Sequence, residues 1–209
     1  LMEELRDPKH YLSVLQSIAF GNTRMNDIVQ RTGIERGPVS KYLSVLQDLR
    51  LIERETPVTE KRPEKSRKGI YRLSDNFFRF WFRFVLPYKS RLVEGGERRI
   101  MEEEILPHLD NFIGQMFDKI CIEILRHIAD EKKIKLNYDL AGRWWNGNEE
   151  IDLVAMVGDK PVFAAECKWS KRPVGIDVLK GLRRKTSLIS EEGRKDHLRL
   201  GLFSRSGFT

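Results

Sequence analysis

The chain of 209 residues has little cysteine. Cys121 and Cys167 both lie in apolar runs rather than in a spaced framework, which argues against a small secreted domain held by disulfides. No apolar stretch is long enough to cross a bilayer, and residues 1–12 do not show the basic and then apolar pattern of a signal peptide. We therefore expect a cytoplasmic protein without a membrane partner.

Positive charge is distributed unevenly along the chain. Residues 1–99 carry 20 Lys/Arg and 13 Asp/Glu, whereas residues 100–209 carry 18 of each, so the net charge of +7 belongs to the first half. Such asymmetry indicates an anionic partner for that half, with nucleic acid as the default candidate. A solvated basic surface is the alternative.

The first half, residues 1–75, has the pattern of a winged helix. Apolar residues recur at helical spacing in residues 8–20, 23–32 and 38–50, and Gly33 marks a tight turn before the third helix. Two short strands then flank a long basic loop. The residues expected to contact DNA lead the third helix or lie in the loop: Arg36, Ser40, Lys41, Ser44, Lys61, Arg62, Lys65, Arg67 and Lys68. A protein-docking module with a solvated loop is the alternative.

Residues 76–107 form a connector that is aromatic at its start and charged at its end. The run NFFRFWFRFVLPY at 76–88 is compatible with stacking on unpaired bases or with burial between domains. Burial is favoured, because aromatic residues all around a helix need covering on several sides. The Gly-Gly break at 95–96 lies near the expected domain boundary.

The last segment, residues 108–209, has the order αβββαβ. A helix is expected at 110–127 and another at about 175–190, with β-rich runs at 134–145, 151–157, 162–169 and 198–203. This order predicts a mixed α/β (α+β) domain whose sheet is flanked by helices.

The two central runs, EEIDLVAMV and PVFAAECKW, are predicted to form a hairpin. If Gly158-Asp159-Lys160 is a three-residue loop, Val157 pairs with Pro161, and Asp152 lies opposite Glu166. Two residues further along each strand, Glu150 lies opposite Lys168. The side chains of Glu150, Asp152, Glu166 and Lys168 then share one face of the sheet. A two-residue loop would shift the register by one and turn Asp152 to the opposite face.

Opposed carboxylates repel each other, and a divalent cation such as Mg²⁺ or Mn²⁺ removes that cost. The bound ion would lower the pKa of an attacking water and neutralise charge on a phosphodiester, while Lys168 would stabilise the same charge or orient the water. A structural ion pair of Lys168 with Glu166 or Glu150 is the competing interpretation.

These residues resemble a known family. Asp152 followed by Glu166-Cys167-Lys168 is similar to the PD-(D/E)XK nuclease superfamily, whose restriction-endonuclease-like core is also αβββαβ. The segments YRLSDNFFRFWFRFV, GRWWNGNEEIDLVA, AECKW and LFSRSGF resemble the C-terminal region of archaeal and bacterial ATPases known as domain of unknown function 234. The resemblance implies a P-loop ATPase domain ahead of this region as a partner, although this chain contains no G-x-x-x-x-G-K-[S/T] motif.

By the same resemblance, Asp118 matches the acidic residue on the first core helix of the superfamily and would be a further catalytic metal ligand. A partly exposed helix residue is the alternative for this position. We expect a DNA-binding, metal-dependent deoxyribonuclease module that forms the C-terminal part of an ATPase. An inactive DNA- or protein-binding regulatory module of an ATPase and a transcription regulator are the alternatives. Homo-oligomer formation stays open.

Overall fold

The computed structural model describes residues 8–189 and 198–209, which form two compact units. The first unit contains the chain up to Glu55 and Arg67–Ile105, and the second contains Thr56–Ser66 and Leu106–Thr209. The long loop that follows Glu55 is therefore part of the second unit. Within the described ranges, no helix combines the length and the apolar character that crossing a membrane requires.

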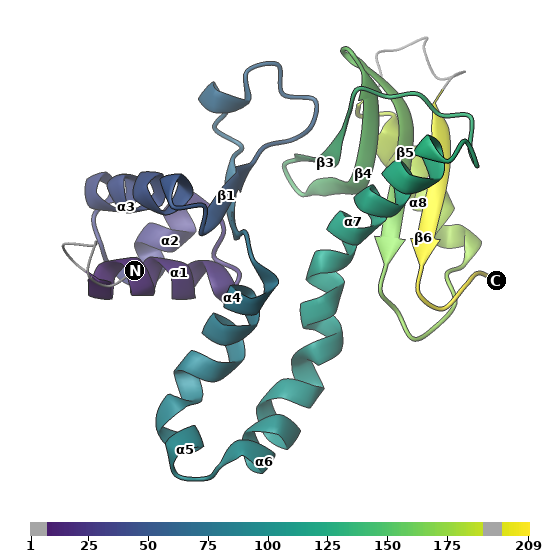
Figure 1. Ribbon diagram of the computed structural model, residues 1–209. Coiled ribbons are helices and arrows are strands. Elements are labelled where there is room, and N and C mark those ends of the chain that lie inside the picture. The colour runs from purple at the N-terminus through teal and green to yellow at the C-terminus, as the bar shows by residue number, and fades with distance from the viewer. Residues whose placement is uncertain (1–7, 190–197) are drawn as a thin grey trace. The chain divides into compact units, whose positions relative to one another are not determined.

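The predicted winged helix is confirmed in the first unit. Helices α1 (Pro8–Ala19), α2 (Met25–Thr32) and α3 (Arg36–Asp48) precede the antiparallel strands β1 (Ile52–Glu55) and β2 (Ile70–Leu73) (Figure 1). Gly33 ends α2 in the left-handed conformation at φ 69°, and its N–H donates to the Val29 carbonyl. This conformation favours glycine because a Cβ would be crowded there. The core of this unit is aliphatic, with Val14, Ile28, Val39, Leu43 and Leu46 almost fully buried.

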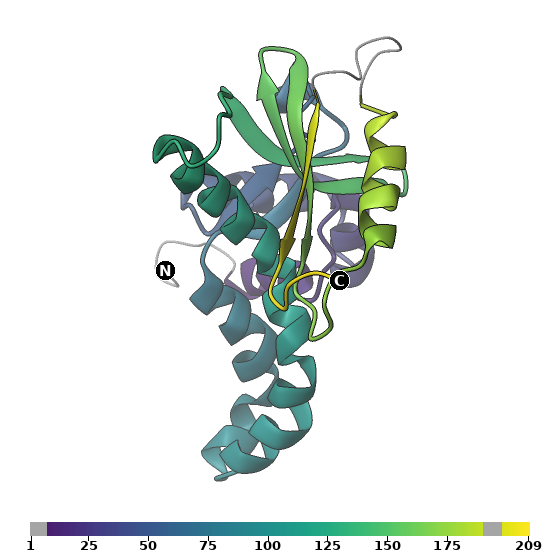
Figure 2. The ribbon, with the colours of Figure 1, turned by 90° about the vertical axis from the view of Figure 1, so that its right-hand side faces the viewer.

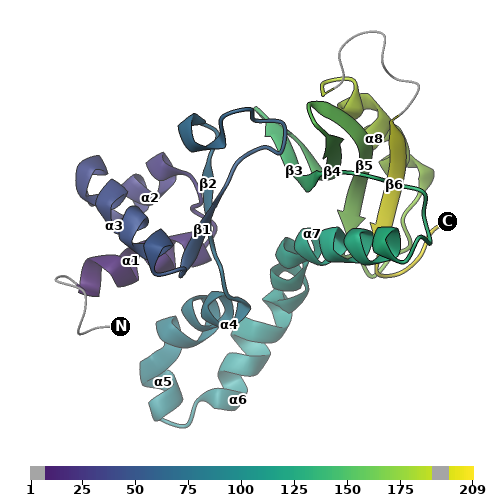
Figure 3. The ribbon, with the colours of Figure 1, turned by 45° about the horizontal axis from the view of Figure 1, so that its top comes forward.

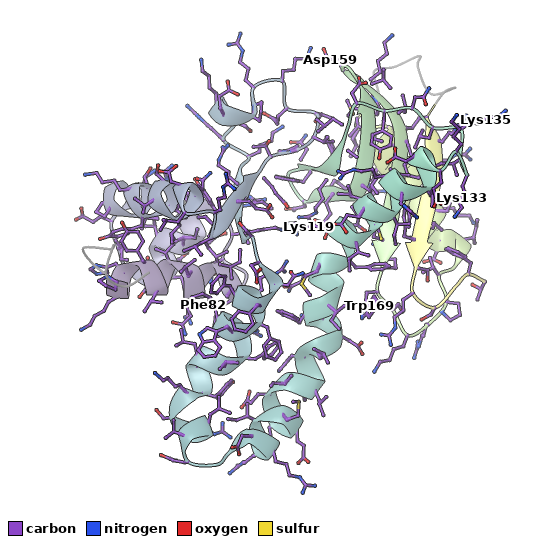
Figure 4. The ribbon with its side chains drawn as sticks, in the orientation of Figure 1. Phe82, Lys119, Lys133, Lys135, Asp159 and Trp169 are labelled. Atoms are coloured by element: carbon purple, nitrogen blue, oxygen red, sulfur yellow. The ribbon has the colours of Figure 1, made fainter. Side chains whose placement is uncertain are left out.

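The connector is a series of short helical pieces. It consists of α4 (Asn76–Phe80), a π-helical turn η2 (Trp81–Val85), a 3₁₀ turn η3 (Leu86–Tyr88), α5 (Lys89–Val93), α6 (Glu97–Ile100) and a second π-helical turn η4 (Met101–Ile105). Asp75 caps α4 by accepting hydrogen bonds from the N–H groups of Phe77 and Phe78. Phe82 is buried in the winged-helix core, so at least part of the aromatic run is used for packing (Figure 4).

The second unit has the predicted order αβββαβ. It runs α7 (Leu106–Asp130), β3 (Leu140–Asn146), β4 (Glu149–Val157), β5 (Lys160–Lys168), α8 (Ile176–Thr186) and β6 (Arg199–Ser204). The strands form one sheet in the order β3-β4-β5-β6, antiparallel except for the parallel pair β5 and β6 (Figure 3). Helix α8 ends at Thr186, and residue 190 of the expected range lies outside the described residues.

The two helices cover opposite faces of this sheet (Figure 2). Helix α7 packs on the face that carries Leu153, Ala155 and Ala165, whereas Val154, Met156 and Ala164 pack in a separate cluster with Leu182 of α8. The change of face at each step follows from the two-residue period of a strand. Burial on both faces explains why β4 and β5 are apolar almost throughout.

The predicted three-residue turn of the β4–β5 hairpin is wrong. Val157 pairs with Lys160 and Met156 with Pro161, so the turn holds only Gly158-Asp159. Gly158 has φ 54°, as tight hairpin turns require. A bulge next to Met156 then adds one residue on β5, and Ala155 pairs with Phe163 as the predicted register requires. Pro161 lies beside this bulge, which fits a residue that has no N–H to donate.

The segment Thr56–Ser66 lies against the edge strand β3. The Val58 N–H donates to the Arg143 carbonyl at 2.8 Å, and the Val58 side chain packs against the cluster that contains Trp144 and Leu182. Pro57 beside it is fully buried.

Candidate functional site

Three charged side chains of the β4–β5 hairpin meet on one face of the sheet. Leu153 pairs with Ala165, and continuing this register places Asp152 opposite Glu166. The Lys168 Nζ lies 3.1 Å from Asp152 Oδ2 and 2.5 Å from Glu166 Oε2. Two carboxylates from neighbouring strands therefore contact a single ammonium group.

Backbone geometry fixes the position of Asp152. The backbone pairing of β4 with β5 reaches Leu153 and Ala165 on this side, and beyond it Asp152 Oδ2 accepts the Cys167 N–H at 2.8 Å. The Asp152 carboxylate thus accepts a hydrogen bond from a backbone amide of β5 just beyond the last paired residues of the two strands. Glu166 is nearly inaccessible, with 4% of its side chain exposed, while Lys168 keeps 38% exposed and so reaches solvent.

Lys185 of α8 is a fourth member of this cluster. Its Nζ lies 2.9 Å from Glu166 Oε1, so each oxygen of the Glu166 carboxylate contacts one ammonium. On the sequence, Lys185 is one of several basic residues of α8 that fit a solvated face. The signal that identifies it is its position three residues after Leu182, which is fully buried on the face of α8 that meets the sheet.

The cluster holds Asp152 and Lys168 in their charged forms. Burial alone would raise the pKa of Asp152, but the charge of Lys168 and the Cys167 N–H outweigh burial and lower it. Burial likewise acts to lower the pKa of Lys168, and the charge of Asp152 with the hydrogen bond to Glu166 raises it instead. Both groups are therefore ionised at neutral pH.

Asp118 is buried on α7 and is held by an arginine. Only 7% of the residue is exposed, so the alternative of a partly exposed helix residue is wrong. The Arg143 Nε lies 3.0 Å from Asp118 Oδ2, and Arg143 Nη2 lies 3.1 Å from Glu150 Oε2. Glu150 therefore binds Arg143, so of the two alternative ion pairs of Lys168, the one with Glu150 is wrong and the one with Glu166 is formed. The register between β3 and β4 shifts here, because the single residue Arg143 lies opposite the two β4 residues Asp152 and Leu153, a bulge that no sequence pattern reveals.

The structure does not gather the three predicted metal ligands into one group. Within residues 8–189 and 198–209, no three His, Cys, Asp or Glu side chains lie together in a way that could hold a metal ion. Asp152 and Glu166 are together at Lys168, and Asp118 is at Arg143. A metal site that includes Asp118 stays a prediction.

The two cysteines, Cys121 and Cys167, are neighbours in the core on the α7 side of the sheet. Cys121 of α7 is fully buried, and both cysteines belong to the core on the α7 face. A hydrogen bond with Cys121 and burial raise the pKa of the Cys167 thiol well above its usual range. Cys167 is therefore a neutral thiol and does not serve as a nucleophile at neutral pH.

The residues expected to contact DNA divide between the two units. Ser40, Lys41 and Ser44 are exposed on α3, and Arg36 donates to Asn26 Oδ1 at 2.7 Å. Arg67 and Lys68 are exposed in the first unit as well. The loop residues of the second unit are Lys61, whose Nζ lies 2.9 Å from Asp159 Oδ2, and the exposed Arg62 and Lys65.

Fold and site define a mixed α/β protein with an N-terminal winged helix and a carboxylate and lysine cluster in an αβββαβ domain. The chain belongs to the family of archaeal and bacterial proteins of unknown function called domain of unknown function 234, which matches residues 81–185. The uncharacterized protein MJECL04 of Methanocaldococcus jannaschii is 35% identical over 191 residues, which are 89% of this chain. The chain spans 42% of the length of that relative. No solved structure matches the chain.

Proposed function

We propose that the chain is a DNA-binding, Mg²⁺-dependent nuclease module that hydrolyses phosphodiester bonds and forms the C-terminal part of a cytoplasmic ATPase. The observation that carries this proposal is the meeting of Asp152 and Glu166 at the Lys168 ammonium. Opposed acids on neighbouring strands are costly, and a sheet that keeps them has a use for concentrated negative charge.

Asp152 and Glu166 are the residues that would hold the metal ion. Their donors are carboxylate oxygens, and Mg²⁺ takes one or two carboxylates and completes its shell with waters and substrate phosphates. When bound, the ion lowers the pKa of a water and neutralises charge on the phosphodiester. Asp118, which pairs with Arg143, remains only a predicted further ligand.

Lys168 is suited to contact the substrate. Its raised pKa keeps the amine protonated at neutral pH, and 38% of its side chain is exposed. An ammonium in this position donates hydrogen bonds to a non-bridging phosphate oxygen as negative charge develops there. Lys185 would continue to neutralise Glu166 from the other side, since its Nζ contacts the second carboxylate oxygen.

DNA binding and the link to an ATPase have separate support. The exposed Arg36, Ser40, Lys41 and Ser44 lie on the third helix of a winged helix, which is the element that enters the major groove in this motif. The longer relative leaves room for a further domain, because this chain spans 42% of it and itself has no P-loop motif.

An inactive binding module of an ATPase is the second candidate. It is favoured by the balance of charge in the cluster, in which two ammonium groups already compensate the two carboxylates. Such a cluster is stable without a metal ion and serves as a buried structural ion-pair network. This candidate predicts DNA or ATPase binding that does not respond to a chelator.

The test is cleavage of plasmid and linear DNA with Mg²⁺ or Mn²⁺ by the chain and by Lys168→Gln. We expect Lys168→Gln and a chelator each to abolish cleavage, whereas Lys180→Gln, which removes an exposed lysine of α8, leaves it intact. Equal cleavage by the chain and Lys168→Gln would reject the nuclease. Absent cleavage together with chelator-insensitive DNA binding would establish the second candidate.

A further inference from the structure

The basic loop at Thr56–Ser66 is anchored as part of the αβββαβ unit. Its Val58 N–H bonds the backbone of β3 at Arg143, and Pro57 is fully buried. Lys61 forms an ion pair with Asp159, which lies at the tip of the β4–β5 hairpin (Figure 4). Pro57, Val58 and Lys61 thus fix the loop on the rest of the second unit.

The anchor depends on close approach to β3. A Cβ placed on Gly142 would be in van der Waals contact with Cβ and Cγ2 of Val58 at 3.4 Å, so a longer, branched side chain there would compete with Val58 for space. The apolar side chain of Val58 also adds to the cluster that contains Trp144 and Leu182. Backbone hydrogen bonding and apolar burial together hold the loop on the strand.

The anchored loop holds two cations, Arg62 and Lys65, in a defined geometry, with Glu64 between them. Arg62 and Lys65 are exposed at the two ends of the 3₁₀ turn η1 (Pro63–Lys65), and the Lys65 N–H bonds the Arg62 carbonyl at 3.0 Å. Pro63 restricts the backbone between them. Two cations in a turned and anchored loop lose less conformational entropy on binding a phosphate backbone than two cations in a flexible loop.

We propose that Thr56–Ser66 is a phosphate-binding element of the second unit and that it binds DNA while docked on β3. The loop would then bind DNA as part of the second unit, which holds Asp152 and Glu166, and not as an undocked wing of the winged helix. This inference rests on the proposed DNA binding but not on cleavage, so DNA affinity tests it even if the chain cuts nothing.

The first experiment measures the salt dependence of binding to a short labelled DNA duplex for the chain and for Arg62→Gln/Lys65→Gln. We expect the slope of log K against log salt concentration to decrease in magnitude by about 1.8, or about 0.9 for each phosphate that the variant no longer neutralises. The control is Arg126→Gln/Lys135→Gln, which removes two exposed charges elsewhere in the same unit and should leave the slope unchanged.

The second experiment undocks the loop without changing its charge. Val58→Pro removes the N–H that bonds Arg143, and Gly142→Ile fills the space that Val58 occupies. Faster cleavage by trypsin after Lys61 and Lys65 reports undocking, and circular dichroism reports that each variant is folded. We expect both variants to lose the same part of the salt slope as Arg62→Gln/Lys65→Gln.

Two results would overturn the inference. An unchanged slope in Arg62→Gln/Lys65→Gln would show that the loop does not contact phosphates. An unchanged or steeper slope in folded, undocked Val58→Pro or Gly142→Ile would show that the loop binds DNA as an undocked wing. If the nuclease proposal alone fails, the chain does not cleave DNA, but the salt slopes of the chain and of Arg62→Gln/Lys65→Gln still differ.

Discussion

The two units use charge in opposite ways. The first unit carries 17 Lys/Arg and 14 Asp/Glu and the second carries 21 and 17, so both are net positive, and the buried residues that the structure describes in the winged helix are apolar except for Ser17. The second unit, in contrast, buries the carboxylates of Asp118 and Glu166. Charge in the first unit lies mostly at the surface, apart from the ion pair of Arg72 with Glu55, whose side chains are 13% and 22% exposed. In the second unit, carboxylates are part of the interior.

This difference indicates where each unit's function resides. Surface charge tunes long-range attraction for a polyanion and has little influence on the fold. Buried charge needs partners in fixed positions, and Asp118 and Glu166 each have them in Arg143, Lys168 and Lys185. The second unit should therefore respond to the loss of one partner far more than the first unit responds to the loss of a surface charge.

The largest expected effect comes from Lys168→Met. Loss of the ammonium leaves Asp152 and Glu166 opposed with only Lys185 near them, and we expect a destabilisation of about 3 kcal/mol. Urea unfolding followed by tryptophan fluorescence measures it. Lys61→Met, which breaks an ion pair between side chains that are 76% and 72% exposed, should change stability by at most about 1 kcal/mol. Equal effects of the two substitutions would contradict the contrast between buried and surface charge.

A smaller effect is expected from acid. The pKa of Asp152 is lowered from its ordinary value of 3.8, so its contribution to stability is complete above 3.8 and disappears as pH falls through the lower folded value. The free energy of unfolding should therefore drop more steeply below this pH in the chain than in Asp152→Asn. Parallel curves for the two proteins would mean that Asp152 has the same pKa in the folded and unfolded states.

The smallest effects come from two glycines, one in each unit, and have opposite signs. Gly33→Ala forces a Cβ into the left-handed conformation at φ 69° and should destabilise the winged helix by about 1 kcal/mol. Gly181→Ala in α8 meets no atom within 4 Å and should stabilise the second unit by about 0.5–1 kcal/mol. Thermal unfolding of both variants tests the signs, and stabilisation by Gly33→Ala would show that this turn relaxes.

Local patterns were sufficient to predict much of the fold. Helical spacing and Gly33 identified the winged helix, and the alternation of β-rich runs and helices identified the order αβββαβ. The hairpin was predicted with the correct pairing around Asp152 but with a turn one residue too long. The bulge beside Pro161 compensates for the shorter turn, and the one sequence signal for it is a proline inside a strand.

The partners of the site residues could not be predicted in the same way. Arg143, which lies opposite a bulge in β4, reaches Asp118 and Glu150, and Lys185 reaches Glu166 because α8 crosses that face of the sheet. The contacts of Arg143 with Asp118 and of Lys185 with Glu166 join residues that are distant in sequence, so neither spacing nor composition encodes them. The assignment of Thr56–Ser66 to the second unit is another long-range result, since the sequence places this loop between two strands of the winged helix.

The hydrogen bond from Val58 to β3 has a consequence for solubility. Strand β3 is at the margin of its sheet, and its backbone groups would otherwise be a template on which another chain could add a strand. Val58 occupies the Arg143 carbonyl, and the buried Pro57 beside it has no N–H with which to extend the pairing. This short segment thereby blocks the addition of a strand to β3 at Arg143, on one of the two edges of the sheet.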